Sequence, residues 1–184
     1  ACQVCSNPVP PGKRKPGSAG IPFGNKVKIV DGEVYVKGPN VFEEYLNRSL
    51  ETSETLENGW LKTGDLGYID SDGYLYLTGR KKELINRGGE KFSPREIEEV
   101  LHQLPEVEET GVVGIPDPVF NEEVAAFIVL RPGASLSKEQ VQTFCRSRMA
   151  IFKVPVEVIF LDSLPKGPSG KIQRRFLREN YMKK

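Results

Sequence analysis

The chain has 184 residues, of which 38% are hydrophobic and 28% are charged, and its 26 basic and 25 acidic side chains leave a formal charge of +1. This composition is typical of a globular protein and excludes collagen, coiled-coil and disordered chains. A near-zero charge argues against a dedicated nucleic-acid binder. No apolar stretch approaches the roughly 20 residues that a membrane helix needs.

Cysteine usage gives little support for a metal or redox site. Three cysteines are too few for a disulfide framework in a chain of this length, which favours a reducing compartment. Cys2 and Cys5 form a C-x-x-C pair, but Cys145 and His102, the other candidate zinc ligands, are remote in sequence. The spacing therefore favours no metal site.

The first part of the chain predicts a β-rich lobe that extends to about residue 79. Residues 1–25 are rich in Pro, Gly, Lys and Asn and predict a loop. Lys26–Val30 and Glu33–Lys37 alternate apolar and polar residues around Asp31-Gly32, which is a strong hairpin signal. Further short strands are predicted at residues 60–63, 67–70 and 74–78, with a turn at 71–73 and a short helix within 45–57.

After Arg80, helical and strand patterns alternate, so the predicted fold class is α+β, with a compact α+β lobe after the β-rich lobe. Ser93–Glu96 and Ser137–Gln140 are capping boxes, so a helix is expected to begin at each. Cys145 should pack in the core as a small hydrophobic residue, and His102 should be structural or surface-exposed. Buried strands are expected at residues 110–115, 124–130 and 156–161, and a basic helix at 172–181.

The first polar cluster is Thr63-Gly64-Asp65. An aspartate beside a glycine at a strand end can accept two hydrogen bonds from the vicinal hydroxyls of a ribose. The alternative is a turn aspartate that satisfies its own backbone. Spacing alone favours this alternative.

The second cluster runs from Gly79 to Lys91 and contains the adjacent glycines Gly88 and Gly89. Adjacent glycines allow positive φ and the close approach of a ligand, and the flanking Arg and Lys side chains could bind phosphate. The alternative is a hairpin turn whose charges face water. The residues alone leave both interpretations open.

The third cluster is Pro165–Lys171, a loop with two glycines and two prolines just before a helix. Residues 166–184 contain seven basic residues and one acidic residue. Such a run usually forms a solvated helix face. Lys171, on a Gly-flanked loop, is a better candidate for anion binding than the helix charges behind it.

Together these clusters resemble the AMP-forming acyl-CoA synthetases of the adenylate-forming superfamily, in that family's order and approximate spacing. Nearly the whole chain shares the resemblance, and the segments that carry it are Gly59–Asp65, Asp72–Ile85 and Pro165–Ile172. Ile85–Lys91 is most similar to the oxalyl-CoA synthetases and related peroxisomal CoA synthetases. The resemblance implies the end of a large N-terminal domain at residues 1–79, a hinge at 80–82 and a small mobile C-terminal domain at 83–184.

The resemblance implies a nucleotide site and a mobile catalytic lysine. Asp65 would bind the ribose hydroxyls of ATP and AMP, and Arg80 would contact the same nucleotide. Lys82 would be the hinge residue. Lys171 would reach the carboxylate and the α-phosphate during adenylation.

The resemblance also implies a CoA surface and an acid–thiol ligase activity. Gly88 and Gly89 would line the pantetheine tunnel, with Lys91 nearby. The substrates would be a carboxylic acid, ATP and CoA, and Mg²⁺ would accompany ATP with its ligands outside this chain. Because the phosphate loop and the acyl pocket of the family are missing, the chain alone is expected to be inactive and to need the N-terminal domain as its partner.

Two other interpretations stay open. One is an adenylation domain that loads a carrier protein, or a luciferase-like relative. The other is a non-catalytic module that binds anionic ligands or a partner through its basic end. The sequence ends in Tyr181–Lys184 without Ser-Lys-Leu, so a cytoplasmic location is expected, although the resemblance includes peroxisomal enzymes.

Overall fold

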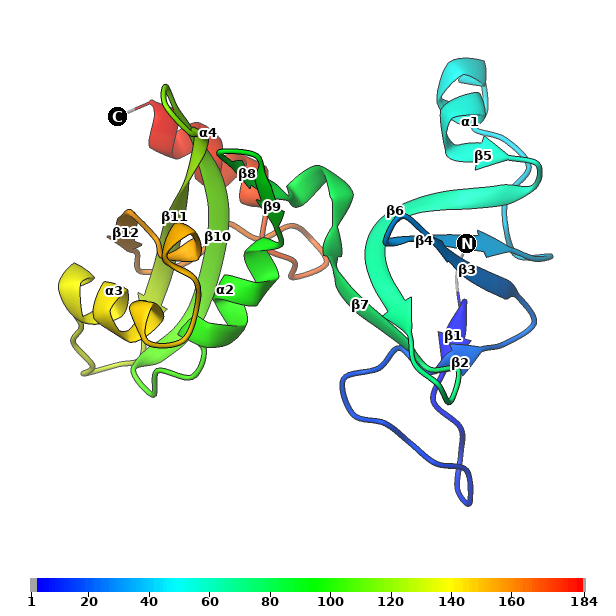
Figure 1. The fold of residues 1–184 in the computed structure, drawn as a ribbon, viewed down its shortest axis with the longest axis horizontal. Helices are drawn as coiled ribbons and strands as arrows, with labels where there is room; N and C mark the ends of the chain where they lie inside the picture. The colour runs from blue at the N-terminus through cyan, green and yellow to red at the C-terminus, as the bar shows by residue number, and fades with distance from the viewer. Residues whose placement is uncertain (1–2, 184) are drawn as a thin grey trace. The chain divides into compact units, whose positions relative to one another are not determined.

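The computed structural model describes residues 3–183, which divide between Lys82 and Glu83 into two compact units (Figure 1). The N-terminal unit consists mainly of strands, and the C-terminal unit packs helices on a sheet. This arrangement confirms the predicted α+β class. Within the described residues, no helix is long and apolar enough to span a bilayer.

The N-terminal unit is organised around one antiparallel sheet. Its elements are β1 (Cys5–Ser6), β2 (Ile21–Pro22), β3 (Lys26–Val30), β4 (Glu33–Lys37), α1 (Ser49–Thr55), β5 (Leu56–Glu57), β6 (Trp60–Ile69) and β7 (Leu75–Arg80). The main sheet has the order β3-β4-β6-β5, with β7 paired to β6, and β1 pairs with β2 separately. The predicted β3–β4 hairpin is confirmed, since Asp31 and Gly32 have φ of +49° and +78° and form its two-residue turn.

One continuous strand, β6, replaces the two short strands predicted at residues 60–63 and 67–70. Gly64 has a φ of +72°, and the register of β6 shifts near this point against both β4 and β7. The Thr63-Gly64-Asp65 segment therefore forms an irregularity inside the strand. The prediction was wrong because partner strands on both sides hold this glycine-containing segment in the sheet, so Asp65 does not lie at a strand end.

The C-terminal unit follows the 3-10 turn η1 (Lys81–Glu83). Its elements are β8 (Ile85–Arg87), β9 (Glu90–Phe92), α2 (Pro94–Leu101), β10 (Val107–Asp117), β11 (Asn121–Leu130), α3 (Lys138–Arg146), η2 (Ile151–Lys153), β12 (Glu157–Phe160) and α4 (Arg174–Met182). The sheet has the order β10-β11-β8-β9, and β12 lies parallel to β11. Both predicted capping boxes are present, at Ser93 and Ser137.

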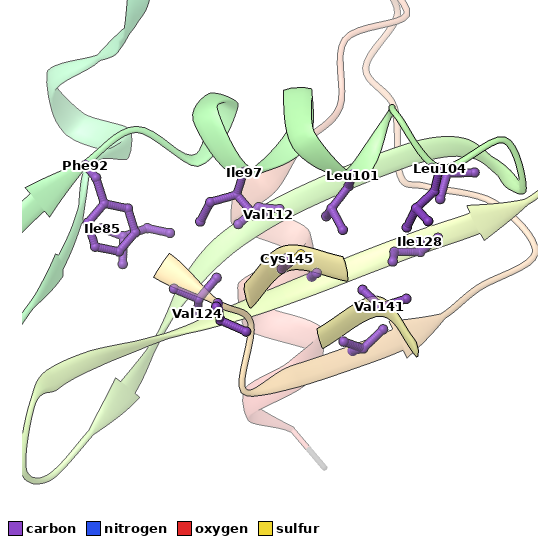
Figure 2. Packing of buried hydrophobic residues seen from close by; sticks show 14 residues of the cluster. Ile85, Phe92, Ile97, Leu101, Leu104, Val112, Val124, Ile128, Val141 and Cys145 are labelled. Atoms are coloured by element: carbon purple, nitrogen blue, oxygen red, sulfur yellow. The ribbon is translucent and has the colours of Figure 1, made fainter. Parts of the chain in front are cut away.

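The sheet of the C-terminal unit is covered on both faces. Alternate residues of β10 and β11 point to opposite sides, and each side has its own hydrophobic cluster. Figure 2 shows Ile97 of α2 and Cys145 of α3 directed into one cluster, with α4 behind the sheet. Leu177 of α4 packs in the other cluster.

The core position predicted for Cys145 and the surface position predicted for His102 are confirmed. Cys145 is completely buried, and burial raises the pKa of its thiol to about 11. His102 is exposed at the C-terminal end of α2. Cys2 lies outside the described residues, and partial burial raises the pKa of Cys5. Within residues 3–183, no group of three or more His, Cys, Asp and Glu side chains could hold a metal.

Ile97→Ala should lower the free energy of unfolding by about 2–5 kcal/mol, because Ile97 is completely buried and its truncation leaves a cavity. Chemical denaturation followed by far-UV circular dichroism measures the change. His102→Ala at the exposed end of the same helix is the matched control and should change stability little. Equal effects of the two substitutions would contradict the packing described for α2.

Candidate functional site

Asp65 and Arg80 face each other across the paired strands β6 and β7. Arg80 Nε lies 2.9 Å from Asp65 Oδ1, and the two side chains are 60% and 27% exposed. The backbone N–H of Asp65 donates to Thr63 Oγ1 at 3.1 Å. The carboxylate therefore pairs with Arg80 and is not a turn aspartate bound to its own backbone, which is the alternative that spacing had favoured.

A buried carboxylate supports this irregular part of β6. Glu33 is 5% exposed, and its Oε1 accepts the Gly64 N–H at 3.1 Å. Its Oε2 accepts from Lys81 Nζ at 2.9 Å, and this bond raises the pKa of Lys81. Sequence reasoning missed Glu33. The available signal was an acidic residue directly after the Asp31-Gly32 turn, at the start of a strand that packs into the core.

Lys82 lies at the end of the N-terminal unit, within η1, and its side chain is exposed. It forms no ion pair with any other described residue. The chain passes from one compact unit to the other directly after it. The assignment of residues 80–82 as a hinge stays a prediction.

Gly88 and Gly89 form the two-residue turn of the β8–β9 hairpin, with φ of +61° and +95°. Lys91 pairs across this hairpin with Asn86 and is exposed. The hairpin turn of the alternative considered from the sequence is therefore observed, although the charge of Arg87 does not simply face water. Arg87, beside the turn, does not offer a free guanidinium to phosphate, because it binds Glu123.

Lys171 stands at the end of a loop closed by its own backbone. The Gly167 N–H donates to the Lys171 carbonyl at 2.9 Å, and the Gln173 N–H donates to the Pro165 carbonyl at 2.8 Å. Gly170, with a φ of +75°, makes the turn possible. The Lys171 side chain is exposed and has no ion-pair partner among the described residues. The loop therefore presents one uncompensated ammonium group.

Most of the basic C-terminal segment is neutralised inside the unit. Four of its seven basic residues pair with carboxylates: Lys166 with Glu109, Arg174 with Glu83 and Glu98, Arg175 with Glu179, and Arg178 with Glu122. Arg175 and Arg178 on α4 are still exposed, as expected for a solvated helix face, but their charges are paired. The same pairing weakens the interpretation of this segment as a free anion-binding surface.

Arg174 forms the most extensive of these interactions. Its Nη2 lies 2.9 and 2.7 Å from the two carboxylate oxygens of Glu98, and its Nη1 lies 3.0 Å from Glu83 Oε2. Glu98, 9% exposed, also accepts the Val112 N–H of β10 at 2.8 Å. Arg174 thus joins the start of α4, three residues after Lys171, to α2 and β10.

Known proteins are similar to part of the C-terminal unit and also to nearly the whole chain. Residues 96–171 match the AMP-binding enzyme C-terminal domain. The chain is 44% identical to the oxalate–CoA ligase of Arabidopsis thaliana, and the match covers 98% of this chain and 38% of that protein. It is 43% identical to the oxalate–CoA ligase of Saccharomyces cerevisiae, and that match covers 98% of this chain and 36% of that protein. Among solved structures, ATP-bound MatB from Rhodopseudomonas palustris is similar, with a TM-score of 0.92, 37% identity, and coverage of 97% of this chain and 38% of that chain.

The chain therefore spans little more than a third of the length of these relatives. The names of the relatives confirm the resemblance to acyl-CoA synthetases that the sequence motifs indicated.

Arg174→Ala should lower the free energy of unfolding by about 2–3 kcal/mol, because it leaves the buried Glu98 carboxylate without its main partner. The neighbouring Arg175→Ala should have little effect, since its ion pair with Glu179 is exposed to solvent. Urea denaturation of both variants measures the difference. If both destabilise equally, Arg174 does not have the anchoring role assigned to it.

Proposed function

We propose that this chain, whose residues 96–171 belong to the AMP-binding enzyme C-terminal domain family, is the C-terminal part of an ATP-dependent acid–CoA ligase. The observation that carries this proposal is the similarity of almost the whole chain to proteins named as CoA ligases. Two features, each within its own unit, support it: the Asp65–Arg80 ion pair of the N-terminal unit and the exposed Lys171 of the C-terminal unit.

The reaction would proceed in two steps. A substrate carboxylate attacks the α-phosphorus of ATP, so that an acyl-adenylate forms and pyrophosphate leaves. The CoA thiolate then attacks the acyl carbonyl, a thioester forms, and AMP leaves. Mg²⁺ would accompany ATP, with ligands that the family resemblance implies outside this chain.

Asp65 and Arg80 would bind the nucleotide. The Asp65 carboxylate is partly exposed and forms an ion pair with Arg80 through Oδ1, so Oδ2 retains lone pairs for the ribose hydroxyls. The Arg80 guanidinium holds the carboxylate in place and keeps further N–H donors for the same nucleotide. Glu33 supports this pair indirectly, because it fixes the backbone at Gly64.

Lys171 would act in the first step. Negative charge is shared between the attacking carboxylate and the phosphoryl oxygens as the bond to phosphorus forms. A positioned ammonium group stabilises that charge, and phosphoryl chemistry depends largely on such positioning and electrostatics. The closed backbone of the loop and the lack of a carboxylate partner among residues 3–183 suit Lys171 to this role.

The Gly88-Gly89 hairpin and Lys91 would act in the second step. Glycines at the turn carry no side chains, and space is open around the position where a Gly89 Cβ would lie. A narrow pantetheine arm can therefore approach the backbone there. Because Lys171 and this hairpin belong to the same unit, rotation at Lys82 would exchange one for the other between the half-reactions.

Lys171→Ala in the full-length enzyme should reduce pyrophosphate exchange by on the order of 10²–10³, because a transition-state charge contact is lost. Thioester formation from preformed acyl-adenylate should change little. Lys166→Ala is the matched control, since Lys166 lies in the same loop but is paired with Glu109. An equal fall of both half-reactions would reject the proposed role of Lys171.

Lys82→Pro should separate the two half-reactions in the opposite sense. Proline fixes φ near −65° and removes a backbone donor, so a residue that must rotate is held in one state. If the adenylating state is retained, pyrophosphate exchange should persist while CoA-dependent thioester formation collapses. Lys82→Ala, which leaves the backbone free, should retain both steps. Loss of both steps in the proline variant, or of neither, would remove the hinge assignment.

A further inference from the structure

A partly buried ion pair lies beside the Gly88-Gly89 turn. Arg87, the last residue of β8, donates from Nε to Glu123 Oε2 at 2.7 Å and from Nη2 to Glu123 Oε1 at 2.6 Å. Glu123 is 8% exposed, and its carboxylate raises the pKa of Arg87. Two parallel bonds fix the plane of the guanidinium as well as its position.

The fixed guanidinium in turn holds an aromatic ring. The Arg87 Cζ lies 4.2 Å from the centroid of the Phe120 ring, within the range of a cation–π contact. The Phe120 carbonyl accepts the Gly88 N–H at 2.7 Å. Phe120 is therefore attached to the hairpin twice, through its side chain at Arg87 and through its backbone at Gly88.

The turn that carries Phe120 is itself well fixed. Asp117 Oδ1 accepts the backbone N–H groups of Val119 and Phe120 at 2.9 and 2.8 Å. Asn121, with a φ of +69°, pairs with Arg87 between β11 and β8. The turn can therefore serve as a rigid support for the neighbouring hairpin.

The hairpin needs such a support. Its strands are three residues each, and β8 pairs with β11 at one position, Arg87 with Asn121, so few sheet contacts hold the tip of the hairpin. The two glycines at its tip also have more conformational freedom to lose than any other residues. A buried ion pair is weak evidence for a role in stability alone, since apolar residues of similar volume often serve as well. Its bidentate geometry points to orientation instead.

We propose that Arg87 and Glu123 are positioning residues for the second half-reaction, and this inference rests on the proposed function. Through Phe120 they hold the Gly88-Gly89 turn in the one conformation that admits the pantetheine arm of CoA. They do not touch the reacting atoms. Their loss therefore affects the use of CoA and leaves adenylation in place.

The kinetic test uses Arg87→Lys and Glu123→Gln in the full-length enzyme. Lysine keeps the charge but loses the planar fork. We expect kcat/KM for CoA to fall by about tenfold to a hundredfold, as small misplacements of positioning groups can cost that much, with little change in pyrophosphate exchange. The double variant should fall no further, because the pair acts as one unit.

The matched control is Arg175→Lys, which alters an exposed Arg–Glu pair of the same 2.6 Å length on α4. It should retain both half-reactions. If pyrophosphate exchange and thioester formation fall equally in Arg87→Lys, together with a lower melting temperature, the pair is a general stabiliser and the proposal is overturned. Unchanged use of CoA in Arg87→Lys also overturns it.

Hydrogen exchange of the Gly88 amide in this 184-residue chain tests whether Arg87 supports the turn, and the measurement needs no enzyme activity. Because this amide donates to Phe120, Arg87→Lys should accelerate its exchange by about tenfold, whereas Arg175→Lys should not. Unchanged exchange in Arg87→Lys overturns the proposed support. A wild-type enzyme that exchanges pyrophosphate but forms no CoA thioester would instead contradict the proposed function, so the two failures are distinguishable.

Discussion

The C-terminal unit depends on the interaction between the buried carboxylate of Glu98 and the guanidinium of Arg174. Glu98 accepts from Arg174 and from the Val112 N–H, so one side chain joins α2, β10 and the start of α4. A carboxylate in this position is tolerable only because it is fully hydrogen-bonded. The Lys171 loop ends three residues before Arg174, so its position depends on this anchor.

The same principle explains which charges remain available for ligands. A largely buried carboxylate binds each of three arginines, Arg87, Arg174 and Arg178. These ion pairs join elements of the fold. Lys171 has no such partner among the described residues and faces solvent. Pairing with carboxylates thus distinguishes the arginines that hold the fold together from Lys171, whose charge is unpaired among the described residues. Lys171 is therefore a cation on a backbone-closed loop whose charge is not used in an ion pair with any described residue.

Local sequence patterns predicted most elements because their signals act over a few residues. The Asp31-Gly32 turn and the capping serines Ser93 and Ser137 satisfy nearby backbone groups, so their effect does not depend on distant contacts. The glycine irregularity at Gly64 was misjudged for the opposite reason. Its outcome depends on β4 and β7, which flank β6 in the sheet.

The sequence by itself determined the α+β class and the two helix starts at Ser93 and Ser137, because periodicity and capping are local properties, and its resemblance to a family implied Asp65, Arg80 and Lys171 as candidates. Only the tertiary structure decided which charges are paired. Arg87 binds Glu123 across 36 positions and Arg174 binds Glu98 across 76. Composition reveals the charges on such residues, but their partners are determined by how the strands and helices pack, since an ion pair requires proximity in space.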